Sequence, residues 1–238
     1  MTLPILLLPG MDGTGELSKP FAEVAPPQFR PIVVSLPDLV SYDALFAAVE
    51  NEVPATGAFA VLGESFSGPL AIRLAARHRD RVVALILSNT FVSAPRSALL
   101  RLVPWRLLFS LDPPGWISRM SMVGRRASKR DVEDIRRTAA LCNPRTMAGR
   151  MDEVLTLKDD HAASGVSCPV LCLRGTEDRL VHASSADRIS RAFPRVTRVE
   201  IAGPHLLLQT RPNETWAAVQ RFFAEQGVMP ETGENGSR

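Results

Sequence analysis

Three side chains of this sequence could together activate a serine hydroxyl: Ser65, Asp178 and His205. A serine hydroxyl is a weak nucleophile near neutral pH, so it needs a base within hydrogen-bond reach and a third group that holds the base in the correct tautomer. A histidine can supply the base, and a carboxylate can supply the third group. The chain order serine, aspartate, histidine therefore predicts acyl-transfer chemistry through a covalent intermediate.

Ser65 lies in the run Gly63-Glu64-Ser65-Phe66-Ser67-Gly68, which follows an apolar stretch and precedes a helical pattern. A sharp strand-to-helix turn needs small residues two places before and after the nucleophile, so that strand and helix can approach closely. Gly63 fills the first place. Ser67 fills the second, where glycine is more usual, and Gly68 follows directly. We interpret Ser65 as a nucleophile on such a turn rather than as a helix-capping serine.

Asp178 and His205 each follow a strand-like run, at residues 170–174 and 196–201. In an open α/β sheet, sites form at the carboxyl ends of the strands. We therefore expect three strand ends to bring these two residues and the serine together. Glu177 is the alternative acid in the same loop, but its side chain is expected to point in a different direction.

The loop after the first apolar run, Leu8-Pro9-Gly10-Met11-Asp12-Gly13-Thr14-Gly15, could supply part of an oxyanion hole. Such a hole needs preorganised N–H donors for the negative charge of a tetrahedral intermediate. We assign one backbone donor to Met11 and the other to Phe66, the residue after the nucleophile. The glycines do not have the spacing Gly-x-Gly-x-x-Gly and no Walker lysine follows, which disfavours a nucleotide site.

Six short apolar runs bounded by turn residues predict buried parallel strands. They span residues 5–8, 31–35, 59–62, 82–87, 170–174 and 196–201. Helical patterns lie between or after them, at 42–53 with Ser41 as cap, after Ser65 with Pro69 in the first turn, at 184–193, and at 214–223 with Asn213 as cap. The alternation predicts an α/β fold with a doubly wound, mostly parallel sheet and right-handed crossovers.

The alternation stops over residues 91–165, where short helical patterns replace strands. We expect this stretch to be a helical cap inserted into one core, formed by residues 1–90 and 166–225. Residues 226–238 are polar and are expected to form a mobile tail.

Three features organise the expected cap. Ser128 with Asp131 resembles a capping box, and Asn143 with Pro144 predicts the start of a further helix. Trp105 and Phe109 lie in a strongly apolar stretch. This stretch either packs the cap onto the sheet or lines a pocket for a hydrophobic acyl group, and we assign both aromatic residues to substrate binding on the second interpretation.

The net charge of +3 is unevenly distributed, because residues 96–150 carry twelve Arg or Lys and four Asp or Glu. That stretch is +8, so the rest of the chain is −5. The basic residues alternate with apolar ones over amphipathic helices, which disfavours a nucleic-acid partner. Most of these arginines are expected to form a solvated outer face, with one or two free to attract an anionic substrate group.

The three cysteines, Cys142, Cys168 and Cys172, are too few and too unevenly spaced for a disulfide framework. We interpret them as buried thiols in a reducing compartment, which predicts a cytoplasmic protein. The four histidines do not complete a zinc site with Cys168 and Cys172, so no metal is expected. No stretch approaches the roughly 20 apolar residues that cross a bilayer, and the N-terminal apolar run lacks a basic leader.

With these residues in place, the chain resembles the α/β-hydrolase superfamily from the Pro9-Gly10 loop to the helix after His205. The resemblance begins at what would be the third strand of the family, and Pro9-Gly10 stands where His-Gly is more frequent. It implies hydrolysis of an acyl bond through an acyl-enzyme, without a metal or organic cofactor.

A carboxylic ester of a small-molecule substrate with a hydrophobic acyl group is the expected substrate. A thioester, a carbon–carbon bond, or acyl transfer to an alcohol would use the same residues. A ligand-binding protein without catalytic activity is the alternative from a different class, and the presence of all three residues disfavours it. The sequence leaves the oligomeric state open.

Overall fold

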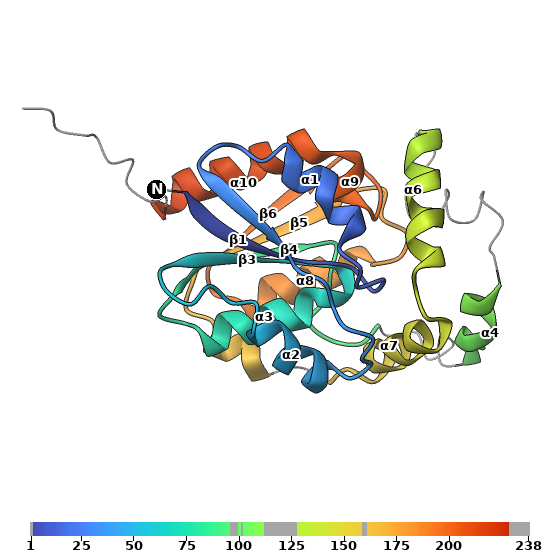
Figure 1. The fold of residues 1–238 in the computed structure, drawn as a ribbon. Coiled ribbons are helices and arrows are strands. Elements are labelled where there is room, and N and C mark those ends of the chain that lie inside the picture. Colours follow the sequence, from blue (N-terminus) through green and yellow to red (C-terminus); the bar gives the residue numbers. More distant parts are fainter. Residues whose placement is uncertain (1, 96–99, 101, 112–127, 159–160, 229–238) are drawn as a thin grey trace, which may run out of the picture.

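A computed structural model of the chain describes residues 2–95, 100, 102–111, 128–158 and 161–228. Its six strands form one sheet in the order β2-β1-β3-β4-β5-β6, and every pairing is parallel (Figure 1). The strands are β1 Leu3–Leu8, β2 Phe29–Val33, β3 Phe59–Glu64, β4 Val82–Ser88, β5 Val170–Gly175 and β6 Val196–Ile201. Their bounds agree with the six predicted runs to within two residues, and the doubly wound α/β fold is confirmed.

Helices cover both faces of this sheet (Figure 1). The helices α2, α3 and α8 lie on one face, and α1, α9 and α10 lie on the other. Their bounds are α1 Lys19–Glu23, α2 Tyr42–Glu50, α3 Gly68–Arg77, α8 Ala183–Ala192, α9 Leu207–Thr210 and α10 Pro212–Gln226. No helix within the described residues is long and apolar enough to cross a membrane.

Two helix boundaries differ from the prediction. Helix α2 begins after Ser41 as expected but ends at Glu50, before the predicted end at residue 53. Pro54 disfavours the helical conformation at Val53, the residue before it. The predicted cap Asn213 is wrong. Helix α10 begins at Pro212 with Arg211 in the capping position, and proline is favoured in the first turn, where no helical acceptor is needed.

The chain between β4 and β5, which we call the β4–β5 segment (residues 91–165), is helical where the structure describes it. It contains α4 Trp105–Ser110, α6 Lys129–Ala140, α7 Pro144–Thr156 and the 3₁₀ helix η5 His161–Gly165. The capping box of Ser128 with Asp131 and the cap by Asn143 are both confirmed. In Figure 1, α4, α6 and α7 lie at the same end of the sheet. The predicted tail falls mainly on residues 229–238, which lie outside the described residues.

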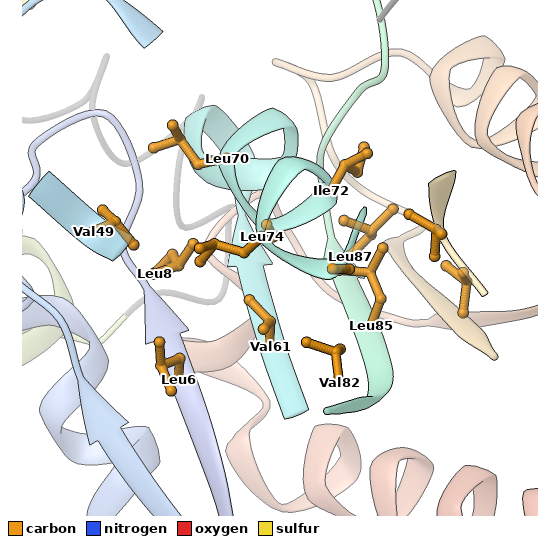
Figure 2. Close-up of a cluster of buried hydrophobic side chains, with 14 of the residues drawn as sticks. Leu6, Leu8, Val49, Val61, Leu70, Ile72, Leu74, Val82, Leu85 and Leu87 are labelled. Atoms are coloured by element: carbon orange, nitrogen blue, oxygen red, sulfur yellow. The ribbon is translucent and has the colours of Figure 1, made fainter. Parts of the chain in front are cut away.

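The core that positions α3 is built by alternate residues of the strands. Leu6 and Leu8 of β1 and Val61 of β3 face α2 and α3, while their neighbours face α1 and α10. Figure 2 shows Leu74 of α3 beside Leu8 of β1, and Leu70 belongs to the same buried cluster. Because α3 is anchored along its apolar face, its first turn is fixed directly after the end of β3.

Candidate active site

Ser65 occupies a sharp turn between β3 and α3. It is the first residue of the 3₁₀ helix η2 (Ser65–Ser67), and its backbone φ angle is +49°. A non-glycine residue in this left-handed region costs about 1–3 kcal/mol and persists where the surroundings impose it. A Cβ atom at Gly63 would lie only 2.7 Å from the Cβ of Ala71, so strand and helix approach as closely as the sequence predicts.

The side chains of Ser65, His205 and Asp178 form one hydrogen-bonded chain. His205 Nε2 lies 2.9 Å from Ser65 Oγ, and His205 Nδ1 lies 2.9 Å from Asp178 Oδ2. With Nδ1–H donating to the carboxylate, Nε2 can accept the serine proton. The side chains of His205 and Asp178 are only 5% and 1% exposed. Residues that follow β3, β5 and β6 therefore meet at one place, as expected.

The loop after β5 selects Asp178 over Glu177 as the partner of the histidine. The second carboxylate oxygen of Asp178, Oδ1, accepts hydrogen bonds from the backbone N–H groups of Leu180 at 2.8 Å and Val181 at 3.0 Å. Glu177 is exposed to solvent. A Cβ atom at Gly175 would lie 2.5 Å from the carbonyl oxygen of Pro204, so only glycine lets the two loops approach this closely.

Asn89, directly after β4, joins these loops and is not among the residues predicted from the sequence. Its Nδ2 donates to the carbonyl oxygens of Pro204 at 3.1 Å and His205 at 2.6 Å, and its Oδ1 accepts from the N–H of Gly175 at 2.7 Å. Its φ angle of +44° lies in the region that asparagine tolerates better than most residues. The signal was present, because Asn89 follows a predicted strand just as Asp178 does.

In the loop after β1, three successive backbone carbonyl groups accept hydrogen bonds. The hydroxyl of Ser67 donates to Pro9, the N–H of Gly13 donates to Gly10 at 3.1 Å, and Arg150 Nη1 donates to Met11 at 2.7 Å. Among the described residues, the N–H of Met11 has no hydrogen-bond acceptor. The described structure therefore leaves this N–H without an acceptor of its own.

The second predicted donor, Phe66, is the second residue of η2. Backbone N–H groups in the first turn of a helix have no acceptor within that helix. The carbonyl oxygen of Phe66 is also fixed, because it accepts a hydrogen bond from the hydroxyl of Tyr42 at 3.0 Å.

Glu64, directly before Ser65, is a buried acid that is not among the site residues predicted from the sequence. It is 2% exposed, and burial raises the pKa of its carboxyl to about 7, against the opposing effects of His205 and Gln209. Its Oε2 accepts from Gln209 Nε2 at 3.2 Å, whereas Oε1 has no partner within the described part of the chain. A charged residue at the end of an apolar strand was the feature of the sequence that could have indicated this buried acid.

A cavity of about 350 Å³ lies beside the Met11 loop. Its lining includes Asp12, Asp38, Cys142 and Arg150, but not the hydrogen-bonded serine, histidine and aspartate. It therefore borders the expected oxyanion loop rather than the serine hydroxyl.

Trp105 and Phe109 do not line this cavity. They stack on each other on α4, with ring centroids 5.9 Å apart, and α4 packs against α7. Their assignment to substrate binding stays a prediction.

The cysteines are free thiols. Cys168 and Cys172 are buried, as predicted, but Cys142 is only half-buried at the cavity. Burial raises the pKa of all three thiols to about 11, which keeps them protonated near neutral pH. Across the described ranges, no three His, Cys, Asp or Glu side chains gather as ligands of a metal ion would.

Comparisons with known proteins agree with this architecture. The sequence model of the family described as "Serine aminopeptidase, S33" matches residues 36–203. An esterase from Thermogutta terrifontis has a similar structure, with a TM-score of 0.79 at 22% identity over 97% of this chain and 92% of that chain. At this identity, the similarity shows the fold alone.

Two curated proteins match shorter stretches. Phytyl ester synthase 1, chloroplastic, from Arabidopsis thaliana is 34% identical over 108 residues, and ethanol acetyltransferase 2 from Hanseniaspora uvarum is 30% identical over 69 residues. These stretches make up 42% and 29% of this chain, but only 15% and 20% of the two relatives.

Proposed function

Since the chain belongs to the family described as serine aminopeptidase S33, within the α/β-hydrolase superfamily, we propose that it is a serine hydrolase that cleaves a carboxylic ester. The observation that carries this proposal is the chain of two 2.9 Å hydrogen bonds from Ser65 through His205 to Asp178. Nucleophile, base and orienting acid are each within the reach that their roles require.

In the acylation step, Ser65 Oγ attacks the ester carbonyl carbon while His205 Nε2 accepts the hydroxyl proton. The carbonyl π electrons move to the oxygen, and this oxyanion accepts hydrogen bonds from the N–H groups of Met11 and Phe66. The bond to the alcohol oxygen then breaks, and the imidazolium returns the proton to that oxygen. Asp178 stays ionised throughout and stabilises the imidazolium.

In the deacylation step, a water molecule gives a proton to His205 Nε2 and attacks the acyl carbon. The bond between that carbon and Ser65 Oγ breaks, the proton returns to the serine, and the carboxylic acid leaves. These steps need only the groups named here, so we propose that the reaction requires no metal and no organic cofactor.

Acyl transfer to an alcohol is the second candidate function. The names of the two curated relatives, an ester synthase and an acetyltransferase, favour it. An alcohol would take the place of water in the second step, with the same proton movements. Adding ethanol or a long-chain alcohol to the assay and measuring the ester formed against the acid released separates the two functions.

Labelling with a fluorophosphonate tests the nucleophile, since this reagent phosphonylates an activated serine. We expect wild type to be labelled and to hydrolyse p-nitrophenyl esters, and we expect Ser65→Ala to lose both properties. Ser88→Ala is the matched control, because Ser88 is a serine at the end of the neighbouring strand β4 whose buried hydroxyl has no partner among the described residues.

Labelling that persists in Ser65→Ala contradicts the assignment of the nucleophile. Absence of both labelling and ester hydrolysis in wild type favours a ligand-binding protein instead. A series of acyl chain lengths tests the preference for a hydrophobic acyl group, and activity on acetate alone contradicts it. An aminoacyl p-nitroanilide measures whether peptide-like bonds are also cleaved.

A further inference from the structure

Arg150 on α7 is a buried cation with an unusual set of partners. Its side chain comes from the β4–β5 segment, is only 2% exposed, and donates to three backbone carbonyl groups. Nε donates to Leu39 at 3.0 Å, Nη1 to Met11 at 2.7 Å and Nη2 to Pro37 at 2.6 Å. No carboxylate of the described residues forms an ion pair with it.

Burial of a guanidinium group is unfavourable by several kcal/mol unless its donors are satisfied. Burial accordingly lowers the pKa of Arg150, while the nearby carboxylates of Asp12 and Asp38 raise it. Hydrogen bonds to neutral carbonyl groups compensate less than an ion pair would. A residue that only filled this space could be apolar, so the three carbonyl contacts, one of them to Met11, are what requires an arginine.

The bond to Met11 completes the orientation of the predicted oxyanion donor. A trans peptide is planar, so the Met11 N–H points opposite to the Gly10 carbonyl group. The N–H of Gly13 holds that carbonyl group, and Arg150 holds the next one, that of Met11. Both peptide planes that flank the Met11 Cα atom are therefore fixed.

Gly13 is adapted to this arrangement. Its φ angle is +73°, and a Cβ atom there would collide with Arg150 Nη1. The loop thus leaves room for the guanidinium group at the point where it reaches the Met11 carbonyl.

The same guanidinium group also contacts the second predicted donor. Arg150 Cζ lies 5.7 Å from the ring centroid of Phe66. The Phe66 ring also stacks on the ring of Tyr42. An arginine over an aromatic ring contributes roughly 0.5–2 kcal/mol, depending on burial. One side chain therefore touches both residues whose N–H groups would stabilise the intermediate.

We propose that Arg150 is a positioning residue for the oxyanion hole, and that through it α7 orients the Met11 donor toward the Phe66 donor. This inference rests on the proposed serine hydrolase function. It assigns a role in rate, rather than in substrate affinity, to a residue of the β4–β5 segment that lies outside the hydrogen-bonded chain of Ser65.

Replacement of Arg150 by methionine tests the proposal. We expect kcat for p-nitrophenyl ester hydrolysis to fall about 100-fold, the effect of a lost oxyanion donor, while KM changes less than about threefold. A trifluoromethyl ketone, which forms an oxyanion adduct with the serine, should bind about 100-fold more weakly. Arg150→Ala should recover part of its kcat when guanidinium chloride is added at millimolar concentration.

Arg81→Met is the matched control. Arg81 also donates to two backbone carbonyl groups, those of Gly57 and Pro54, and lies 5.3 Å from the ring centroid of Phe59. It precedes β4, at the opposite end of the sheet from Ser65. Because Arg81 is less buried than Arg150, we expect a smaller loss of thermal stability, no change in kcat and no response to guanidinium.

Each outcome decides one question. If wild type shows neither labelling nor hydrolysis, the proposed function fails. If wild type is active and Arg150→Met keeps its kcat, or if Arg81→Met loses the same activity, the positioning role is wrong and the function stands. Should the methionine variant not fold, Arg150→Lys decides, because its single ammonium group cannot hold three carbonyl groups. A wild-type kcat in that variant overturns the proposal.

Discussion

Ser67 provides a hydroxyl group at the position where a glycine was expected. This hydroxyl donates to the Pro9 carbonyl and ties the nucleophile turn to the Met11 loop. Glycine is required at the next position instead, because a Cβ atom at Gly68 would collide with Thr90. Thr90 in turn donates to the carbonyl of Ser65. The departure from the common motif therefore adds a contact without widening the turn.

Glu64 predicts a pH dependence of stability at the residue scale. Its pKa is about 7 when folded and 4.5 in an ordinary environment, so the folded state binds more protons between these values. The stability that this proton contributes is present at low pH and is lost as the pH rises through about 7. The shift corresponds to about 3 kcal/mol.

Glu64→Gln removes this titration and keeps the shape of the neutral acid. We expect the unfolding free energy of wild type, relative to the variant, to decrease by about 3 kcal/mol from pH 4 to pH 8 in urea titrations. Glu177→Gln, at an exposed position, is the control. A constant difference across this range would contradict a raised pKa.

At the scale of elements, the site depends on how four strand ends are held together. Asn89 at the end of β4 bridges the loops after β5 and β6 with three hydrogen bonds to the backbone. The loop after β5 carries Asp178 and the loop after β6 carries His205. The distance between these two side chains is therefore set partly by an asparagine that belongs to neither loop.

Asn89→Ala should therefore reduce both stability and rate. It leaves the buried Pro204 carbonyl group and the buried Gly175 N–H without their Asn89 partner, whereas the His205 carbonyl group keeps the N–H of Leu207 at 2.9 Å. At about 1–3 kcal/mol for each unpaired group, we expect a loss of at least about 2 kcal/mol. We expect kcat to fall at least about tenfold, which corresponds to an activation free energy raised by about 1.4 kcal/mol. Denaturant titration and ester hydrolysis measure the two effects.

Asn51→Ala is the control for this substitution. Asn51 is exposed and makes one side-chain hydrogen bond, to the carbonyl of Ala47 at 3.2 Å. We expect its stability to change by less than about 0.5 kcal/mol. An Asn89→Ala variant as active and stable as this control would show that the bridge has no role.

Residues governed by local rules were predictable from the sequence. The strands follow from apolar runs, the caps Ser41, Ser128 and Asn143 follow from helix-start chemistry, and Ser65 follows from its turn. The short helices α1 and α9 were missed, because five and four residues are too few to show a helical period.

Arg150 shows what local rules leave out. It follows Met147 by three residues and precedes Val154 by four, so it lies on the same face of α7 as these apolar residues. The solvated outer face expected for most arginines of residues 96–150 does not hold for this one, which is buried. Its acceptors lie more than 100 residues away in the chain, and no local pattern indicates such a contact.

At the scale of the whole molecule, part of the apolar core lies at the end of the sheet opposite to the site. Ser65 follows the end of β3, whereas Phe29 begins β2 and packs against Phe223 of α10, with ring centroids 5.1 Å apart. Phe223 is completely buried. Its apolar contacts therefore belong to the core, away from the hydrogen-bonded chain.

Phe223→Ala should lower stability without a change in turnover. We expect a loss of about 3–5 kcal/mol from the cavity and the lost burial. Thermal unfolding measures this loss, and kcat per labelled serine, at a temperature where the variant is folded, measures turnover. A fall in that kcat would show that the α10 core and the site are coupled.

Gly13 and Arg150 have a consequence for how this protein can diverge. A side chain at residue 13 and the guanidinium group of residue 150 would occupy the same space, so the two positions constrain each other. We expect homologous sequences that carry a larger residue at position 13 to have lost the arginine as well. Laboratory evolution that starts from Arg150→Met should accept Gly13→Asn, a residue that tolerates the left-handed conformation, which wild type would reject.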